Sequence, residues 1–119
     1  MFRSWVILGL LWVRLASADD IGLALTGDAW RWWKGAAEPS SPPEAWRQAG
    51  FNDSAWSVGR AGFSWYYTGY EATAFPEDPV DSRSVYLRRE FVVEAPSSVQ
   101  WLTLRIDYDD GFVAFLNGG

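Results

Sequence analysis

The chain has 119 residues, of which 49% are apolar and 21% are charged, and its formal net charge is −5. This length and composition suit a single globular domain, and the negative charge disfavours nucleic acid and anionic lipid as partners because their phosphates repel it. The sequence contains no Cys and no His, which excludes a disulfide framework, a thiolate metal site and a catalytic triad with an imidazole from this chain.

Residues 1–18 have the three-part layout of a secretory signal peptide. A basic N-terminal segment precedes an apolar run from Val6 to Leu15, and Ala16-Ser17-Ala18 supplies small residues at the two positions that signal peptidase reads. A buried strand or a membrane anchor is the alternative, but a run of about ten residues is too short to span about 30 Å of hydrocarbon. We therefore predict cleavage before Asp19, a mature domain at residues 19–119, a secreted or cell-surface location and no membrane attachment after cleavage.

The first predicted strands lie early in the mature domain. Residues 21–25 (IGLAL) form a short apolar run, which predicts a strand. Residues 29–35 (AWRWWKG) predict a second strand, in which Trp30 and Trp32 share one face because side chains alternate along a strand. Prolines in residues 36–43 exclude a strand ladder and predict a loop.

A helical turn and an Asx turn are predicted next. Residues 44–49 lie between a proline and a glycine, which favour the start and the end of a helix respectively. The Asn-Asp-Ser centre of residues 51–56 favours an Asx turn, in which a side-chain oxygen accepts a backbone hydrogen bond. This turn leaves Phe51 and Trp56 free to point inward.

Residues 57–84 are predicted to be a long irregular excursion, because glycines and then prolines interrupt any regular element. Loops of more than about 12–15 residues in a compact domain are usually functional or mobile. We expect Phe63 and Trp65 to pack into the core. Three tyrosines can either cover the core or stack on a sugar ring, and these candidate carbohydrate-binding residues are Tyr66, Tyr67 and Tyr70.

Residues 85–93 (VYLRREFVV) alternate with period two and predict a strand with one buried face. The set pointing one way comprises Leu87, Arg89, Phe91 and Val93. The opposite set comprises Tyr86, Arg88, Glu90 and Val92. Because alternation separates Arg88 from Arg89, one surface holds at most one of them, and we expect the other to pair with an acid or lie over an aromatic ring.

Residues 101–116 predict an antiparallel hairpin. Its first strand places four side chains on one face, namely Leu102, Leu104, Ile106 and Tyr108. Asp109-Asp110-Gly111 supplies the tight reversal, since Asp tolerates left-handed backbone angles and Gly adopts them freely. Residues 112–116 are then the returning strand.

The densest carboxylate cluster consists of Asp107, Asp109 and Asp110. Oxygen ligands suit Ca²⁺, so Asp109 and Asp110 are candidate ligands of a structural calcium ion. An acid pair for glycoside hydrolysis is a further interpretation, but such a pair converges on a sugar from two sides, whereas adjacent turn residues diverge. We favour a simple turn over calcium, and calcium over catalysis.

Short strands, Gly, Pro and Asp turns and the lack of a long helical pattern predict an all-β fold, an antiparallel β-sandwich. The order of short motifs from Leu25 to Gly118 also resembles the galactose-binding-domain-like jelly roll, a non-catalytic module of large secreted bacterial proteins. It is similar as well to the related sugar-binding domain of β-galactosidase-type glycoside hydrolases. The matching residues are Trp30, Lys34-Gly35, Glu38-Pro39, Trp46, FNDSAW at 51–56, YLRREF at 86–91, YDDG at 108–111 and LNG at 116–118.

The chain departs from that family in two places. Such domains continue beyond the Leu116-Asn117-Gly118 motif with further strands, so the resemblance implies a chain that is truncated at its C-terminus, with an open strand edge. The glycine-rich loop, where the family has a Gly-Tyr-Gly-type run followed by acidic residues, reads GFSWYY at residues 62–67. Ligand contacts in that loop therefore do not carry over.

The sequence predicts a non-catalytic secreted module that binds carbohydrate or docks against another domain of its parent protein, with no cofactor apart from the candidate calcium ion. One alternative is the N-terminal accessory domain of a larger secreted glycoside hydrolase or esterase whose active site lies beyond this chain. The other is a structural spacer or surface-assembly domain without a ligand.

Overall fold

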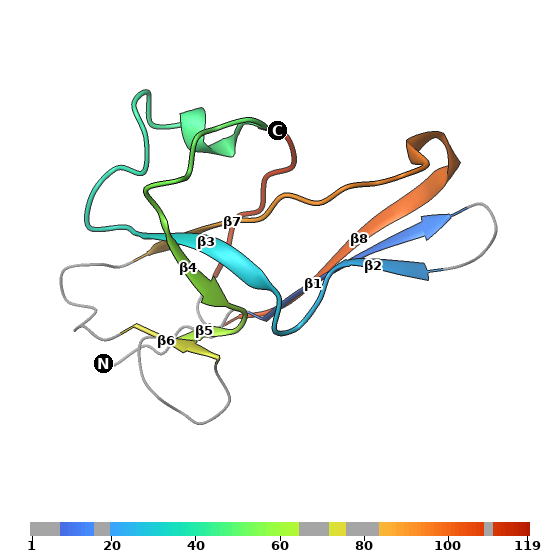
Figure 1. Cartoon of the computed structure of the whole chain (residues 1–119), viewed down its shortest axis with the longest axis horizontal. Helices are drawn as coiled ribbons and strands as arrows, with labels where there is room; N and C mark the ends of the chain where they lie inside the picture. Colours follow the sequence, from blue (N-terminus) through green and yellow to red (C-terminus); the bar gives the residue numbers. More distant parts are fainter. Residues whose placement is uncertain (1–7, 16–19, 65–71, 76–83, 109–110) are drawn as a thin grey trace.

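The computed structural model describes residues 8–15, 20–64, 72–75, 84–108 and 111–119 (Figure 1). Strands make up 38% of the chain and helices 7%, so the predicted all-β class is confirmed. The helical segments among the described residues are single 3-10 turns, η1 (Ala45–Arg47) and η3 (Pro96–Ser98). Within the described ranges, no helix has the length and apolar character needed to cross a membrane.

One three-stranded antiparallel sheet has the order β4-β3-β7. Its strands are β3 (Ala29–Lys34), β4 (Ser57–Arg60) and β7 (Val85–Arg88). β3 is the second strand predicted from the sequence, and it pairs with both neighbours. Its Trp30 and Trp32 pack together against the core, as the alternation predicts.

The core lies beside this sheet and consists of Ala61, Phe63 and Phe75, each at most 3% exposed. The rings of Phe63 and Phe75 stack with centroids 5.9 Å apart, and Trp32 meets Phe75 edge-on at 4.9 Å. Phe63 lies in the short strand β5 (Phe63–Ser64), and Phe75 directly follows β6 (Thr73–Ala74), which pairs with β5 in parallel. The prediction that Phe63 packs inward is confirmed, whereas Trp65 lies outside the described residues.

The second three-stranded sheet has the order β2-β1-β8 and is also antiparallel. Its strands are β1 (Leu8–Leu15), β2 (Asp20–Ala24) and β8 (Val99–Asp107). Its strands project to one side of the first sheet (Figure 1). The radius of gyration is accordingly 15.2 Å, against about 13.5 Å for a compact domain of this length.

The loops around β3 follow the sequence predictions. Residues 36–43 contain no strand, and η1 is the single helical turn expected within residues 44–49. The Asx turn is present, since the backbone N–H of Ser54 donates to the side-chain oxygen of Asn52 at 3.1 Å. Trp56, which follows it, is 4% exposed.

Two strand predictions need correction. The hairpin at residues 101–116 is wrong: β8 pairs with β1, and residues 111–116 are not in a strand. The strand predicted at residues 85–93 ends at Arg88, although its alternation persists beyond β7, since Val92 is 79% exposed while Phe91 and Val93 are partly buried. Local periodicity reports which face is buried, but only tertiary contacts choose the neighbouring strand.

The apolar run predicted to belong to a signal peptide forms β1 in this structure of the whole chain. Cleavage before Asp19 stays a prediction, and residues 16–19 lie outside the described residues.

Candidate functional site

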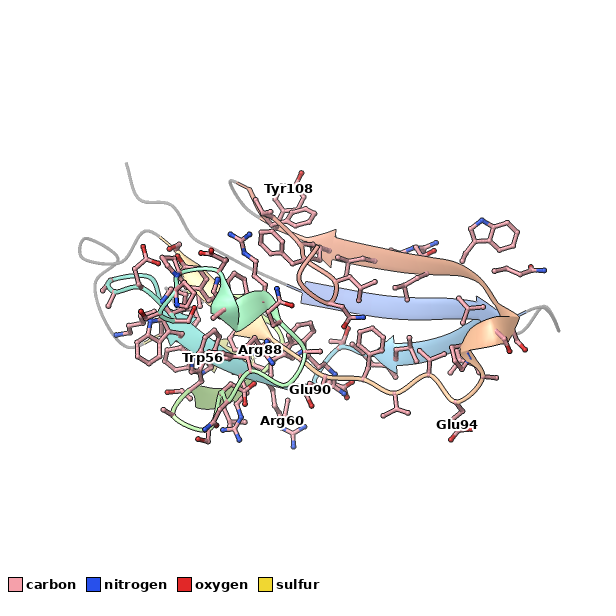
Figure 2. All side chains as sticks on the ribbon, turned by 90° about the horizontal axis from the view of Figure 1, so that it is seen from above. Trp56, Arg60, Arg88, Glu90, Glu94 and Tyr108 are labelled. Carbon is pink, nitrogen blue, oxygen red and sulfur yellow. The ribbon has the colours of Figure 1, made fainter. Side chains whose placement is uncertain are left out.

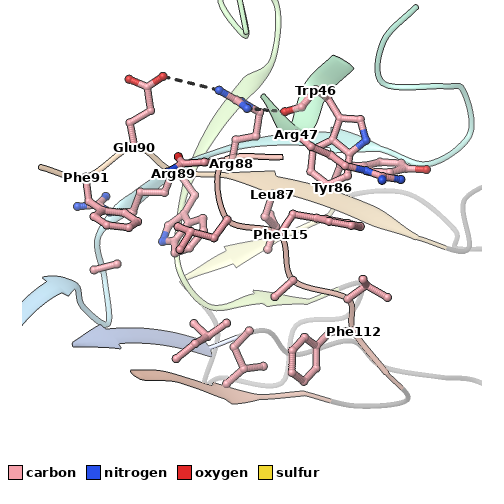
Figure 3. A pocket seen from close by; sticks show the side chains of 18 of the residues that line it. Trp46, Arg47, Tyr86, Leu87, Arg88, Arg89, Glu90, Phe91, Phe112 and Phe115 are labelled. Carbon is pink, nitrogen blue, oxygen red and sulfur yellow. Dashed lines mark hydrogen bonds and ion pairs between the residues drawn. The ribbon is translucent and has the colours of Figure 1, made fainter. Parts of the chain in front are cut away.

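A groove with a volume of about 1530 Å³ opens between the two sheets and the C-terminal segment (Figure 3). We call it the apolar groove. β8 contributes one wall with Leu102, Leu104 and Ile106, the side chains that the sequence places on one strand face. Leu102 and Leu104 remain 39% and 41% exposed, so the inner face of β8 is only partly covered.

β7 and the residues after it form the opposite wall. Leu87, Phe91 and Val93 line the groove from this side, and Leu87 also packs against the core. Figure 3 shows Phe112 on the β8 side of the groove, away from Leu87 and Phe115. The groove is therefore continuous with the hydrophobic core at one end and open to solvent along β8.

The C-terminal segment, residues 111–119, borders the groove without joining either sheet. Phe115 anchors it: its ring meets Trp46 edge-on at 5.7 Å, and the guanidinium carbon of Arg47 lies 4.1 Å from its centroid. The segment still exposes large apolar side chains into the opening. They are Phe112 at 46%, Val113 at 76%, Phe115 at 36% and Leu116 at 49%.

Arg88, the last residue of β7, lies at the edge of the groove and is only 9% exposed. Its Nε donates to Asp53 Oδ2 at 3.0 Å, and its Nη1 donates to the carbonyls of Trp46 and Gln48. Its guanidinium also lies 5.1 Å from the ring centroid of Phe51. These contacts occupy the guanidinium, so Arg88 organises the loop rather than offering charge to a ligand.

Arg89 has different contacts from Arg88, because its side chain points to the opposite face of the strand end. Its Nη2 lies 2.8 Å from Asp28 Oδ2, and its Nη1 donates to the carbonyl of Ala29 at 2.6 Å. The prediction that an arginine of this pair meets an acid or an aromatic ring is confirmed for both residues, because loops cover both faces of the strand end.

Trp33, Trp46 and Trp56 have neighbouring rings, and Figure 2 shows Trp56 near Arg88, the last residue of β7. Trp56 lies 6.0 Å from Trp33, 6.3 Å from Trp46 and 5.9 Å from Phe51 between ring centroids. Trp46 also meets Tyr86 edge-on at 5.1 Å. Most of these faces are engaged within the protein, so the cluster is a second packing centre and not an open stacking platform.

Most of the site residues predicted from the sequence lie outside the residues that the structure describes. Tyr66, Tyr67 and Tyr70, predicted to stack on a sugar, lie outside the described residues, as do the candidate calcium ligands Asp109 and Asp110. Asp107 ends β8 and is exposed. Within the described part, no group of three or more acidic side chains is placed to hold a metal ion.

The groove itself was not predicted as a site, although the pattern that forms it is visible in the sequence. Alternation on residues 102–106 marks the inner face of β8, but nothing local indicates that the facing layer leaves it partly uncovered. Three residues of the groove lining carry a buried donor that has no acceptor among the described residues: Nε1 of Trp30, Nε of Arg47 and Nε of Arg89. Such a group is destabilising unless a partner or water satisfies it.

Comparison with known proteins gives no relative: the chain matches no protein-family model, and no curated protein or solved structure matches it at a significant level. The chemistry of the groove therefore has to be argued from its residues. Apolar side chains line most of it, and Arg88, its most buried cation, is already paired. The groove is built to bury apolar surface.

Proposed function

We propose that this chain is a non-catalytic module of a secreted protein, and that the apolar groove docks an apolar surface of another domain of the same parent. In this proposal the two sheets are the layers of an antiparallel β-sandwich of the galactose-binding-like jelly-roll type. The observation that carries it is the uncovered inner face of β8, with Leu102 and Leu104 about 40% exposed beside a groove of 1530 Å³.

The size and lining of the groove favour a domain over a small ligand. Pockets for small molecules measure roughly 300–1,000 Å³ and place a few free polar groups at defined points, whereas this groove is larger and mostly apolar. Sugar hydroxyls buried here would lose water without matching hydrogen bonds, which is unfavourable. Apolar side chains of a protein surface would instead gain by leaving water.

The overall charge indicates what kind of partner surface the groove would meet. The net charge of −5 favours a partner whose rim is basic. The carbohydrate interpretation depends on Tyr66, Tyr67 and Tyr70 and stays a prediction.

A matched pair of substitutions, Val113→Asp and Val92→Asp, tests whether the groove is open. The valines are 76% and 79% exposed, but of the two only Val113 lines the groove. The full chain is titrated with anilinonaphthalene sulfonate, which binds exposed apolar surface. We expect V113D to lower dye binding and V92D to leave it unchanged. Equal binding by both variants and the wild type contradicts an accessible groove.

Docking is tested by joining the chain to the neighbouring domain of its parent protein. Hydrogen exchange of residues 102–106 should slow in the joined protein, because docking covers the inner face of β8. V113D should abolish this protection, whereas V92D should retain it. Unchanged exchange on joining the domain overturns the docking proposal, even if the dye shows the groove to be open.

A further inference from the structure

β1 occupies the centre of its sheet, although the same residues are predicted to be the apolar run of a removable signal peptide. All eight residues of β1 have a register partner on β8, and four of them also have one on β2. The strand therefore supplies the only link between its two neighbours within the described sheet.

Removal of residues 1–18 would leave two facing strand edges. Neighbouring strands lie about 4.8 Å apart, so β2 and β8 would stand about 9.6 Å apart, too far to hydrogen-bond with each other. β8, with nine residues, would present a long row of unpaired N–H and C=O groups. Such an edge is a template for pairing with another chain.

We propose that the position between β2 and β8 is a strand-accepting site, which an apolar strand of a partner polypeptide occupies once residues 1–18 have been removed. This inference rests on the removal of residues 1–18 that a secreted module implies, but not on docking in the groove, because it concerns backbone pairing within one sheet. β-Strand addition of this kind draws its affinity from main-chain hydrogen bonds.

β1, which lies between β2 and β8 in this structure, indicates what kind of partner strand would fit there. It is eight residues long, runs antiparallel to both neighbours and reads LGLLWVRL. Its one charged residue, Arg14, holds the register position opposite Asp20. We therefore infer an apolar partner strand without proline, carrying a basic residue near the end that pairs with Asp20, since opposite charges on facing positions stabilise a sheet.

The test uses the full chain with a protease site inserted between Ala18 and Asp19. The folded protein is cut, and a labelled peptide of sequence LGLLWVRL with a solubilising lysine tag is added. We expect the peptide to replace the cut segment and remain bound through gel filtration. The control peptide carries proline in place of Leu11 and Val13, which pair on both sides; we expect no binding, because proline lacks the N–H.

Register gives a sharper measurement, because the natural chain has no cysteine to interfere. A peptide with cysteine in place of Trp12 should form a disulfide with Thr103→Cys, its register partner. It should form none with Asp107→Cys, which lies about 13 Å farther along the strand, beyond disulfide reach. Equal cross-linking at both positions, or binding of the proline peptide, overturns the proposal.

A second variant covers the case in which the inserted site prevents folding. The full chain with Leu11→Pro and Val13→Pro loses β1 as a pairing strand without any insertion. In the absence of peptide, we expect this variant to unfold without a cooperative transition. Addition of the wild-type peptide should restore a cooperative transition. Absence of rescue by the wild-type peptide, or equal rescue by the proline peptide, contradicts a strand-accepting site.

Discussion

Arg31 and Arg88 lie directly opposite each other on β3 and β7, and the carboxylate of Asp53 is shared between them. Asp53 Oδ2 lies 3.0 Å from Nε of Arg88, and Oδ1 lies 3.7 Å from Nε of Arg31. Two like charges on facing positions destabilise a sheet. Asp53 removes that penalty and ties the loop after η1 to both strands.

Asp53→Ala should therefore lower the free energy of unfolding by about 2–3 kcal/mol, because it leaves the buried Arg88 without its acid and facing Arg31. Chemical denaturation with urea measures the change as a shift of the midpoint. The control is Glu90→Ala, whose carboxylate is 75% exposed and 3.7 Å from Arg88; it should cost no more than about 1 kcal/mol. If both variants lost the same free energy of unfolding, Asp53 would have no special role in pairing the two arginines.

Phe63→Ala should cost about 3–5 kcal/mol, since Phe63 is 1% exposed and its removal leaves a cavity against Phe75. Thermal or urea unfolding reports the loss. Val92→Ala, at a side chain 79% exposed, should stay within about 0.5 kcal/mol of the wild type. A small effect of Phe63→Ala would mean that this core is not the stabilising centre of the first sheet.

Gly59→Ala should destabilise the fold by about 1–3 kcal/mol through overpacking. An added Cβ would lie 2.7 Å from Oγ1 and 2.8 Å from Cγ2 of Thr73, and 3.0 Å from Cε1 of Phe63. Thr73 has little freedom to move away, because its hydroxyl donates to the carbonyl of Arg60 at 2.7 Å. The control is Gly111→Ala, where a Cβ meets nothing within 4 Å. Comparable urea midpoints for both variants would contradict the close approach at Gly59.

Phe115→Ala should release the C-terminal segment while leaving the β3 sheet folded. The lost contacts with Trp46 and Arg47 are together worth about 1–2 kcal/mol, which corresponds to exchange about ten-fold faster. Hydrogen exchange of residues 111–119 measures this local effect. Val113→Ala, at a side chain that is 76% exposed, should leave the exchange rates unchanged. Uniformly faster exchange across the whole chain would show that Phe115 supports the global fold instead.

The local elements around β3 were predictable because short-range chemistry determines them. Proline removes a donor from the ladder, so the loop at residues 36–43 follows from its sequence. Asn52 accepts the hydrogen bond of an Asx turn within three residues, and alternation places Trp30 and Trp32 on one face. Each of these features depends on neighbours in the chain and requires no distant contact.

The partner of β8 was decided by tertiary structure. Its inner face could be identified from the period-two pattern, but a strand with one apolar face accepts any neighbour of the right pattern, and β1 lies more than 80 residues away in the sequence. The same holds for Arg88, whose acid is Asp53, 35 residues away. The groove likewise exists only because β8, β7 and the C-terminal segment meet incompletely in the folded chain.

The sequence by itself thus determined the all-β class, the loop at residues 36–43, the Asx turn at Asn52 and which side of β8 is apolar. Only the tertiary structure decided which strands pair, where Arg88 finds its carboxylate and how much of the apolar face of Leu102 and Leu104 stays uncovered. The physical reason is range: backbone preference and alternation act over a few residues, whereas pairing and burial depend on surfaces that the folded chain brings together.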